Sequence, residues 1–90
     1  VMVSCEVGNV AKSLAGHDKD SVYLIVKAKG DIVWVCDGKH KGVSAPKKKN
    51  KKHIQVQQVN DNPLKEKILS GEVRDEEVKY FLKTWGFLNV

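Results

Sequence analysis

The chain contains few of the residues that build covalent or metal-centred sites. Its 90 residues include two cysteines, Cys5 and Cys36, and no Cys-x-x-Cys or His-x(3–5)-His spacing. Zinc sites need such closely spaced ligands, and small secreted domains usually carry four or more cysteines. The sequence therefore predicts no metal and no cofactor, and two buried thiols in a reducing cytoplasm. The sequence leaves open whether the two cysteines form a disulfide.

Catalytic and membrane signals are also missing. The chain has no glycine-rich phosphate loop, and Glu76 and Glu77 are neighbours that point in different directions on a helix. The lysines near Cys36 are expected to lower the pKa of its thiol, which would make it mildly reactive without forming an active site. The longest apolar run is residues 22–26, against the roughly 20 residues of a membrane span. We expect neither an enzyme nor a small-molecule or membrane partner.

One basic segment dominates what is present. Residues 39–52 contain seven lysines and no acidic residue, whereas the net charge of the whole chain is +5. The remainder of the chain therefore carries −2, and the basicity is local. A local patch of one sign favours a polyanionic partner. The segment is predicted to be a loop on a rigid scaffold, and it is either a solvated charged loop or a contact for a phosphate backbone.

The apolar pattern around this segment predicts a mainly β chain that ends in one or two helices. Strands are expected at residues 7–12, 22–26, 32–36 and 53–56, with a short additional strand around Val43. Residues 22–36 are predicted to form a hairpin. Residues 1–60 form the expected β domain, and residues 61–90 form the helical extension.

Two helix signals occupy the extension. Asn62 and Pro63 predict a helix start, and residues 70–71 predict its end. Asp75 is expected to cap a second helix, which Gly86 ends. Four residues of that helix recur at the spacing of an amphipathic face, namely Val78, Phe81, Leu82 and Trp85. The aromatic residues Phe81, Trp85 and Phe87 are expected in the core.

Two aromatic residues of the hairpin have two interpretations. Tyr23 and Trp34 are predicted on the same face of the sheet, where they either complete the core or stack on exposed bases of single-stranded RNA. Lysine suits phosphate contacts without base selectivity.

Four segments, in order, resemble the KOW motif and the strands that follow it. Residues 7–19 (Val-Gly-Asn-Val-Ala-Lys-Ser-Leu-Ala-Gly-His-Asp-Lys) resemble the motif itself, and residues 23–27, 33–38 and 47–54 resemble the next segments. Together they are similar to the small bacterial KOW-domain RNA-binding proteins, which are related to the fourteen-e type large-subunit ribosomal protein family. The resemblance implies a small SH3-like β-barrel and binding to ribosomal RNA.

In this family the loop after the first strand commonly contacts RNA, which carries over to residues 16–19. The motif commonly continues Lys-Gly, but here Lys19 is followed by Asp20, and Asp18 and Asp20 leave this loop nearly neutral. The lysine segment is therefore expected to supply most of the phosphate contacts.

The sequence thus predicts a ribosome-associated RNA-binding protein whose further partners are ribosomal or other translation proteins. The alternative is an SH3-like protein-interaction module of the translation or transcription machinery. The expected RNA-binding residues are Lys12, Gly16, His17, Lys19, Trp34, Lys39, Lys41, Lys47, Lys48, Lys49, Lys51, Lys52 and His53.

Overall fold

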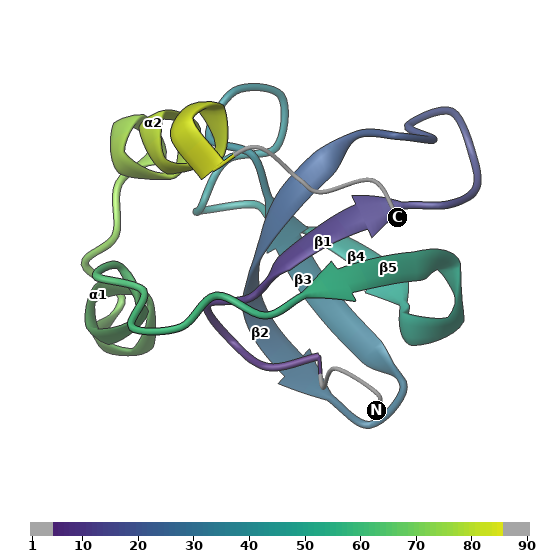
Figure 1. Cartoon of the computed structure of the whole chain (residues 1–90), viewed down its shortest axis with the longest axis horizontal. Coiled ribbons are helices and arrows are strands. Elements are labelled where there is room, and N and C mark those ends of the chain that lie inside the picture. The colour runs from purple at the N-terminus through teal and green to yellow at the C-terminus, as the bar shows by residue number, and fades with distance from the viewer. Residues whose placement is uncertain (1–4, 86–90) are drawn as a thin grey trace.

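The computed structural model describes residues 5–85 as a five-stranded antiparallel sheet with two short helices (Figure 1). The sheet order is β4-β3-β2-β1-β5. Its strands are β1 (Val10–Ser13), β2 (Val22–Lys29), β3 (Ile32–Cys36), β4 (Lys47–Asn50) and β5 (Ile54–Gln57). A single 3₁₀ turn, η1 (Lys51–His53), joins the two edge strands. No ladder between β4 and β5 closes the sheet within residues 5–85.

The predicted hairpin is confirmed, whereas two predicted strand positions are wrong. β2 and β3 pair across a turn in which Gly30 has a φ of 59°. The first strand begins at Val10 rather than at residue 7, since Gly8 turns the chain with a φ of 93°. Val43 lies in a loop, and the fourth strand is formed by the lysine segment itself. Lysine has a low intrinsic preference for strands, so pairing with β3 overrides local propensity here.

The sheet buries apolar side chains on both of its faces. The inner face carries one cluster, made of Ala11, Tyr23, Ile25, Val33, Val35 and Ile54. The outer face carries a second cluster, in which Leu24 and Cys36 pack against Leu64, Ile68, Val73 and Val78 from the helical segment. Strand alternation accounts for the division, because successive residues point to opposite faces.

Two helices cover one end of the outer face, α1 (Lys65–Ser70) and α2 (Asp75–Trp85), and Figure 1 shows both on the same side of the sheet. The predicted start at Asn62 and Pro63 is two residues too early: α1 begins at Lys65 with Leu64 at the N-cap position, and the Asn62 side chain accepts a hydrogen bond from the Leu64 N–H. α1 ends at Gly71, as predicted, and Gly71 adopts the left-handed conformation. Gly86 and Phe87 lie outside the described residues. In the described part of the chain, neither helix is long and apolar enough to cross a membrane.

The start of α2 differs from the prediction. Asp75 is the first residue of α2, but its Oδ1 accepts a hydrogen bond from the Val43 N–H at 2.7 Å. Glu77 accepts the Arg74 N–H instead. Gly38 lies against this turn, and a Cβ there would come within 2.2 Å of the Asp75 carbonyl oxygen. Asp75 and Gly38 therefore fix the loop between β3 and β4 against the helix.

Candidate nucleic-acid interface

The strand β4 divides the lysine segment between the two faces of the sheet. Lys47 and Lys49 are paired with Val35 and Val33, which are buried in the inner cluster. Lys48 is paired with Trp34 on the outer face. Directly opposed residues in an antiparallel pair share a face. Three consecutive lysines therefore lie in two different environments, and the prediction of one continuous basic loop over residues 39–52 is wrong.

On the inner side, two lysines converge on one carboxylate. Lys49 Nζ donates to Asp18 Oδ1 at 2.7 Å, and Lys47 Nζ donates to Asp18 Oδ2 at 2.9 Å. The Tyr23 hydroxyl donates to Oδ2 at 2.7 Å, and the Ser13 hydroxyl donates to Oδ1 at 2.9 Å. The side chains of Asp18 and Lys49 are only 13% and 10% exposed. These five residues, named here the Asp18 cluster, join the loop after β1 to β4.

The Asp18 cluster stabilises the ionised carboxylate. Burial opposes ionisation of Asp18, but the hydrogen bonds from Lys49, Lys47, Tyr23 and Ser13 outweigh it and hold the pKa of the carboxyl well below its usual range. Burial, followed by the neighbouring Asp18, raises the pKa of Tyr23 to about 12. The carboxylate stays charged and Tyr23 stays a hydrogen-bond donor at neutral pH. Lys47 and Lys49 thus have an internal anionic partner.

The loop after β1 has a structural role that the sequence does not reveal. Asp18 lowers the charge of this loop, as the composition indicates, and it also neutralises part of the lysine segment more than 28 residues away. Gly16, His17 and Lys19 are exposed. Lys12 Nζ lies 3.8 Å from the Asp20 carboxylate. Gly16, His17 and Lys19 belong to the loop after β1, whereas Lys12 lies in β1 and is paired with Val22, away from the Lys27–Trp34 pair.

On the outer side, Trp34 lies between two lysines. Lys27 Nζ lies 4.8 Å from the centroid of the Trp34 ring, and Lys48 Nζ lies 5.9 Å from it. Both ammonium groups are within cation–π range. Trp34 is partly exposed, and both lysines are exposed. The outer face thus combines a partly exposed aromatic ring with two exposed positive charges.

The predicted placement of Tyr23 beside Trp34 is wrong. Tyr23 belongs to the inner cluster, with its hydroxyl on Asp18, whereas Trp34 belongs to the opposite face. The register of β2 and β3 explains the difference, because Val33 and Val35 occupy the inner face on either side of Trp34. Of the two aromatic residues of the hairpin, only Trp34 can meet an external base.

Two further lysines, which the sequence does not single out, lie on the outer face beside Trp34. Lys27 is paired with Trp34, and Lys29 is paired with Ile32 one step further along the same face. A register shift between Ile25 and Lys27 gives β2 a bulge at Val26. The alternation Lys-Ala-Lys at residues 27–29 predicts that the two lysines share one face of a strand. These lysines lie outside the lysine segment at residues 39–52. Lys27, Lys29, Trp34 and Lys48 are named here the basic-aromatic face.

The remaining predicted residues lie at opposite ends of β4. Lys51, Lys52 and His53 form η1, whose start is held to the β2–β3 turn by a hydrogen bond from the Lys51 N–H to the Asp31 carbonyl at 2.9 Å. This turn adjoins the end of the sheet that carries Lys29 and Ile32. Lys52 and His53 are exposed, and Lys52 extends the positive charge around that end.

The other end holds Lys39 and Lys41. Asp37 Oδ1 accepts the backbone N–H groups of Lys39, His40 and Lys41 at 2.8–2.9 Å. Burial opposes ionisation of Asp37, but these backbone hydrogen bonds lower its pKa. The turn is also fixed against α2 by Gly38. Lys39 and Lys41 thus lie at one end of the paired strands β3 and β4, and η1 lies at the other end.

The two cysteines are free thiols. Burial, followed by the nearby Asp75 and Asp37, raises the pKa of the Cys36 thiol to about 12. The expectation that neighbouring lysines lower this pKa is therefore wrong. Cys36 packs in the outer cluster with Leu24. In the described part of the chain, no group of three His, Cys, Asp or Glu residues could hold a metal ion.

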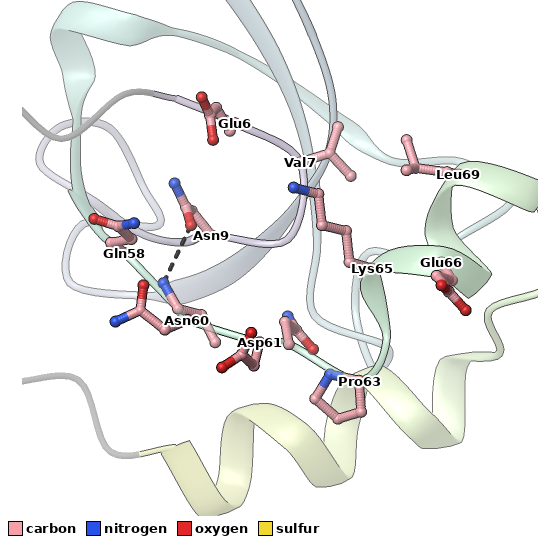
Figure 2. Close-up of a pocket in the computed structure, with 12 residues that line it drawn as sticks. Glu6, Val7, Asn9, Gln58, Asn60, Asp61, Pro63, Lys65, Glu66 and Leu69 are labelled. Carbon is pink, nitrogen blue, oxygen red and sulfur yellow. Dashed lines mark hydrogen bonds between the residues drawn. The ribbon is translucent and has the colours of Figure 1, made fainter.

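A hollow of about 630 Å³ lies between the segment before β1 and the segment before α1. The carboxylates of Glu6, Asp61 and Glu66 stand on different sides of it, and Lys65 is the one cationic residue among the described residues that line it (Figure 2). Asn9 Oδ1 accepts the Val59 N–H there at 3.1 Å. Three carboxylates against one amine disfavour a phosphate chain, so this hollow is a poor candidate for RNA contact.

No protein-family model matches the chain, and a comparison with curated protein sequences finds no match. The KOW resemblance therefore stays a prediction from the four segments. The candidate site is defined by the geometry of its own residues.

Proposed function

We propose that this protein binds RNA through the basic-aromatic face and the adjoining η1 turn. The observation that carries the proposal is the partly exposed Trp34 ring between Lys27 and Lys48. An aromatic platform flanked by lysines suits a single-stranded segment, because bases stack on the ring while the lysines neutralise phosphates. Ribosomal RNA is the first RNA to test, since the resemblance to KOW-domain proteins implies it.

The proposed architecture is an SH3-like barrel. Its support is the strand order, in which the two edge strands β4 and β5 are joined by only the three residues of η1. So short a connection requires the sheet to curl until its two edges approach each other. The inner cluster would then be the interior of the barrel, with the Asp18 cluster at its mouth.

The affinity is expected to depend strongly on salt. Four exposed lysines lie on the face and the turn, namely Lys27, Lys29, Lys48 and Lys52. If each neutralises one phosphate of a single strand, log K falls with log salt at a slope of about −3. Lys47 and Lys49 add nothing to this slope while they remain on Asp18.

The test is the binding of a fluorescently labelled ten-nucleotide oligouridylate at several salt concentrations. Quenching of Trp34 fluorescence should accompany binding and should be absent in Trp34→Phe, while Trp85 supplies a constant background. Crosslinking in cells, followed by sequencing of the attached RNA, identifies the natural ligand. Salt-independent binding, or binding that leaves the Trp34 signal unchanged, would refute the proposal.

A protein-interaction module is the second candidate. The observation that favours it is the exposure of Leu69 on α1 and Tyr80 on α2, which are 67% and 69% accessible. Tyr80, Phe81 and Leu64 also line a mainly apolar hollow of about 330 Å³. Gradient sedimentation of a cell extract separates the two candidates: nuclease treatment should release an RNA-bound protein and leave a protein-bound one in its complex.

A further inference from the structure

A second hollow, of about 360 Å³, adjoins the basic-aromatic face. Its volume is at the small end of the range of about 300–1,000 Å³ in which proteins hold small organic ligands. Most of its lining is apolar, and this part consists of Val26, Val43, Pro46, Ile68 and Val73. The lining comes from β2, from the loop before β4, from α1 and from the connection between the two helices.

The hollow and the face share Lys27. Lys27 lines the hollow, and its Nζ lies 4.8 Å from the centroid of the Trp34 ring. The bulge at Val26 explains this double role, because the shift in register directs Val26 towards the outer cluster and Lys27 towards Trp34. An apolar surface thus begins where the aromatic platform ends, with a cation between them.

The charge of the lining selects among possible occupants. Among the described residues that line this hollow none is acidic, and Lys27 is the one charged side chain. This contrasts with the hollow in Figure 2, whose lining includes three carboxylates. A ligand with a flat ring whose faces are apolar, joined to a negative group, fits this arrangement, and a nucleotide has that chemistry.

We infer that this hollow takes one unstacked nucleobase, with the phosphate of that nucleotide on Lys27 and the neighbouring base on Trp34. The inference rests on the proposed function and adds to it a second base position. Ser44, an exposed residue of the lining, places a hydroxyl at the rim that can bond to the edge of the base or to the 2′-OH. The RNA would bend from the face into the boundary between the sheet and the helices.

Two trinucleotide probes test the base position in the unaltered protein. The first is triadenylate, and the second is a trinucleotide of abasic ribose units with the same phosphates. Amide chemical shifts are followed on ¹⁵N-labelled protein. We expect triadenylate to shift the amides of residues 43–45 and 71–73 together with that of Trp34, and the abasic probe to shift the lysine-bearing strands alone.

A matched pair of variants measures the contribution of the hollow. Ser44→Tyr introduces a bulky side chain at a lining residue, and Ala45→Tyr introduces the same side chain at an exposed neighbour outside the lining. Because the new side chain occupies the position of the base, Ser44→Tyr should weaken binding of ten-nucleotide oligoadenylate about tenfold. Ala45→Tyr should bind as the unaltered protein does.

The outcomes separate the two proposals. Identical shift patterns for the two trinucleotides, or equal affinities of Ser44→Tyr and Ala45→Tyr, would overturn the base position while leaving RNA binding intact. The absence of shifts with either probe, and of any salt-dependent binding of the longer oligonucleotide, would overturn the proposed function itself.

Discussion

Lys48 and its two neighbours differ in what surrounds them, although the three are consecutive. Lys48 is exposed beside Trp34, whereas Lys47 and Lys49 donate to Asp18 on the opposite side of the sheet. The period of two along a strand produces this difference. A run of seven lysines therefore does not provide seven charges to a partner, and the local fold decides which of them are available.

The two sides of β4 also differ in the property they are expected to affect: the inner side affects stability, and the outer side affects binding. The Asp18 cluster is largely buried and joins the loop after β1 to the edge strand β4. The basic-aromatic face is exposed, and its charges contribute little to folding, because exposed ion interactions are weak. Substitutions on the two sides of β4 should therefore change different measured quantities, and the following predictions test this, beginning with the largest expected effect.

The largest effect is expected for Asp18→Asn. The change leaves the ammonium groups of Lys47 and Lys49 without a counter-ion, and breaking a buried ion pair from one side typically costs about 3 kcal/mol or more. We expect the free energy of unfolding in urea to fall by about 3 kcal/mol. Asp20→Asn is the control, since Asp20 is exposed with its partner 3.8 Å away, and its effect should stay below about 0.5 kcal/mol. Equal effects at the two positions would contradict the structural role of Asp18.

The next effect concerns RNA affinity. Replacing Lys27, Lys29 and Lys48 with Gln removes three phosphate contacts, each of which contributes about 0.7 to the salt slope. We expect a loss of about a hundredfold in affinity at 0.1 M salt, a slope reduced by about 2, and unchanged stability. The control variant changes Lys65, Lys79 and Lys83, which are exposed on the helical side. If both variants lose affinity equally, the attraction depends on net charge and the face has no special role.

A smaller loss of affinity is expected for Trp34→Ala. Stacking of one base contributes about 1–3 kcal/mol, so binding of single-stranded RNA should weaken about tenfold while the salt slope stays the same. Tyr80→Ala is the matched control, because Tyr80 is an exposed aromatic residue on α2. A change in the slope at Trp34, or a similar loss at Tyr80, would argue against stacking on this face.

Acid should destabilise the inner side of β4. The pKa of Asp18 in the folded protein lies below its usual value, which is about 3.9 in an unfolded chain. As the pH falls below about 4, the unfolded chain takes up a proton that the native carboxylate does not, so the free energy of unfolding decreases. This stability is fully present above that pH. Urea denaturation between pH 6 and pH 2 should show a shallower decline for Asp18→Asn, and parallel curves would contradict the account.

The smallest effect is expected for Tyr23→Phe. The change removes one of four donors to Asp18 and keeps the ring in the inner cluster. A hydrogen bond to a charged group contributes about 1.5 kcal/mol, so thermal or urea unfolding should report a loss of about 1–2 kcal/mol. RNA affinity should be unaffected. A weaker affinity without a loss of stability would place Tyr23 in the interface after all.

Parts of the fold follow from local patterns in the sequence. The β2–β3 hairpin and the amphipathic helix α2 are predicted because their own residues carry the required period and turn signals. β4 is not predictable in this way, since four polar residues form a strand only because β3 supplies the partner and Asp18 supplies the counter-charge. Such a dependence on residues 29 and 31 positions away is not visible in a local window.

The sequence also predicts only part of the candidate site. Trp34 and Lys48 are both expected RNA contacts, but their pairing across β3 and β4 depends on the register. The sequence does not single out Lys27 and Lys29, because they lie outside residues 39–52. The charge of the segment and its resemblance to the KOW family predict Lys47 and Lys49 as RNA contacts, whereas in the structure both donate to Asp18.

The most direct test of this division is NMR of the lysine ammonium groups during titration with ten-nucleotide oligouridylate, because it requires no substitution. We predict that the Nζ signals of Lys27 and Lys48 shift with RNA, while those of Lys47 and Lys49 keep their positions and their couplings to Asp18. Shifts of Lys47 and Lys49 as large as that of Lys48 would contradict the account and would show that RNA opens the Asp18 cluster.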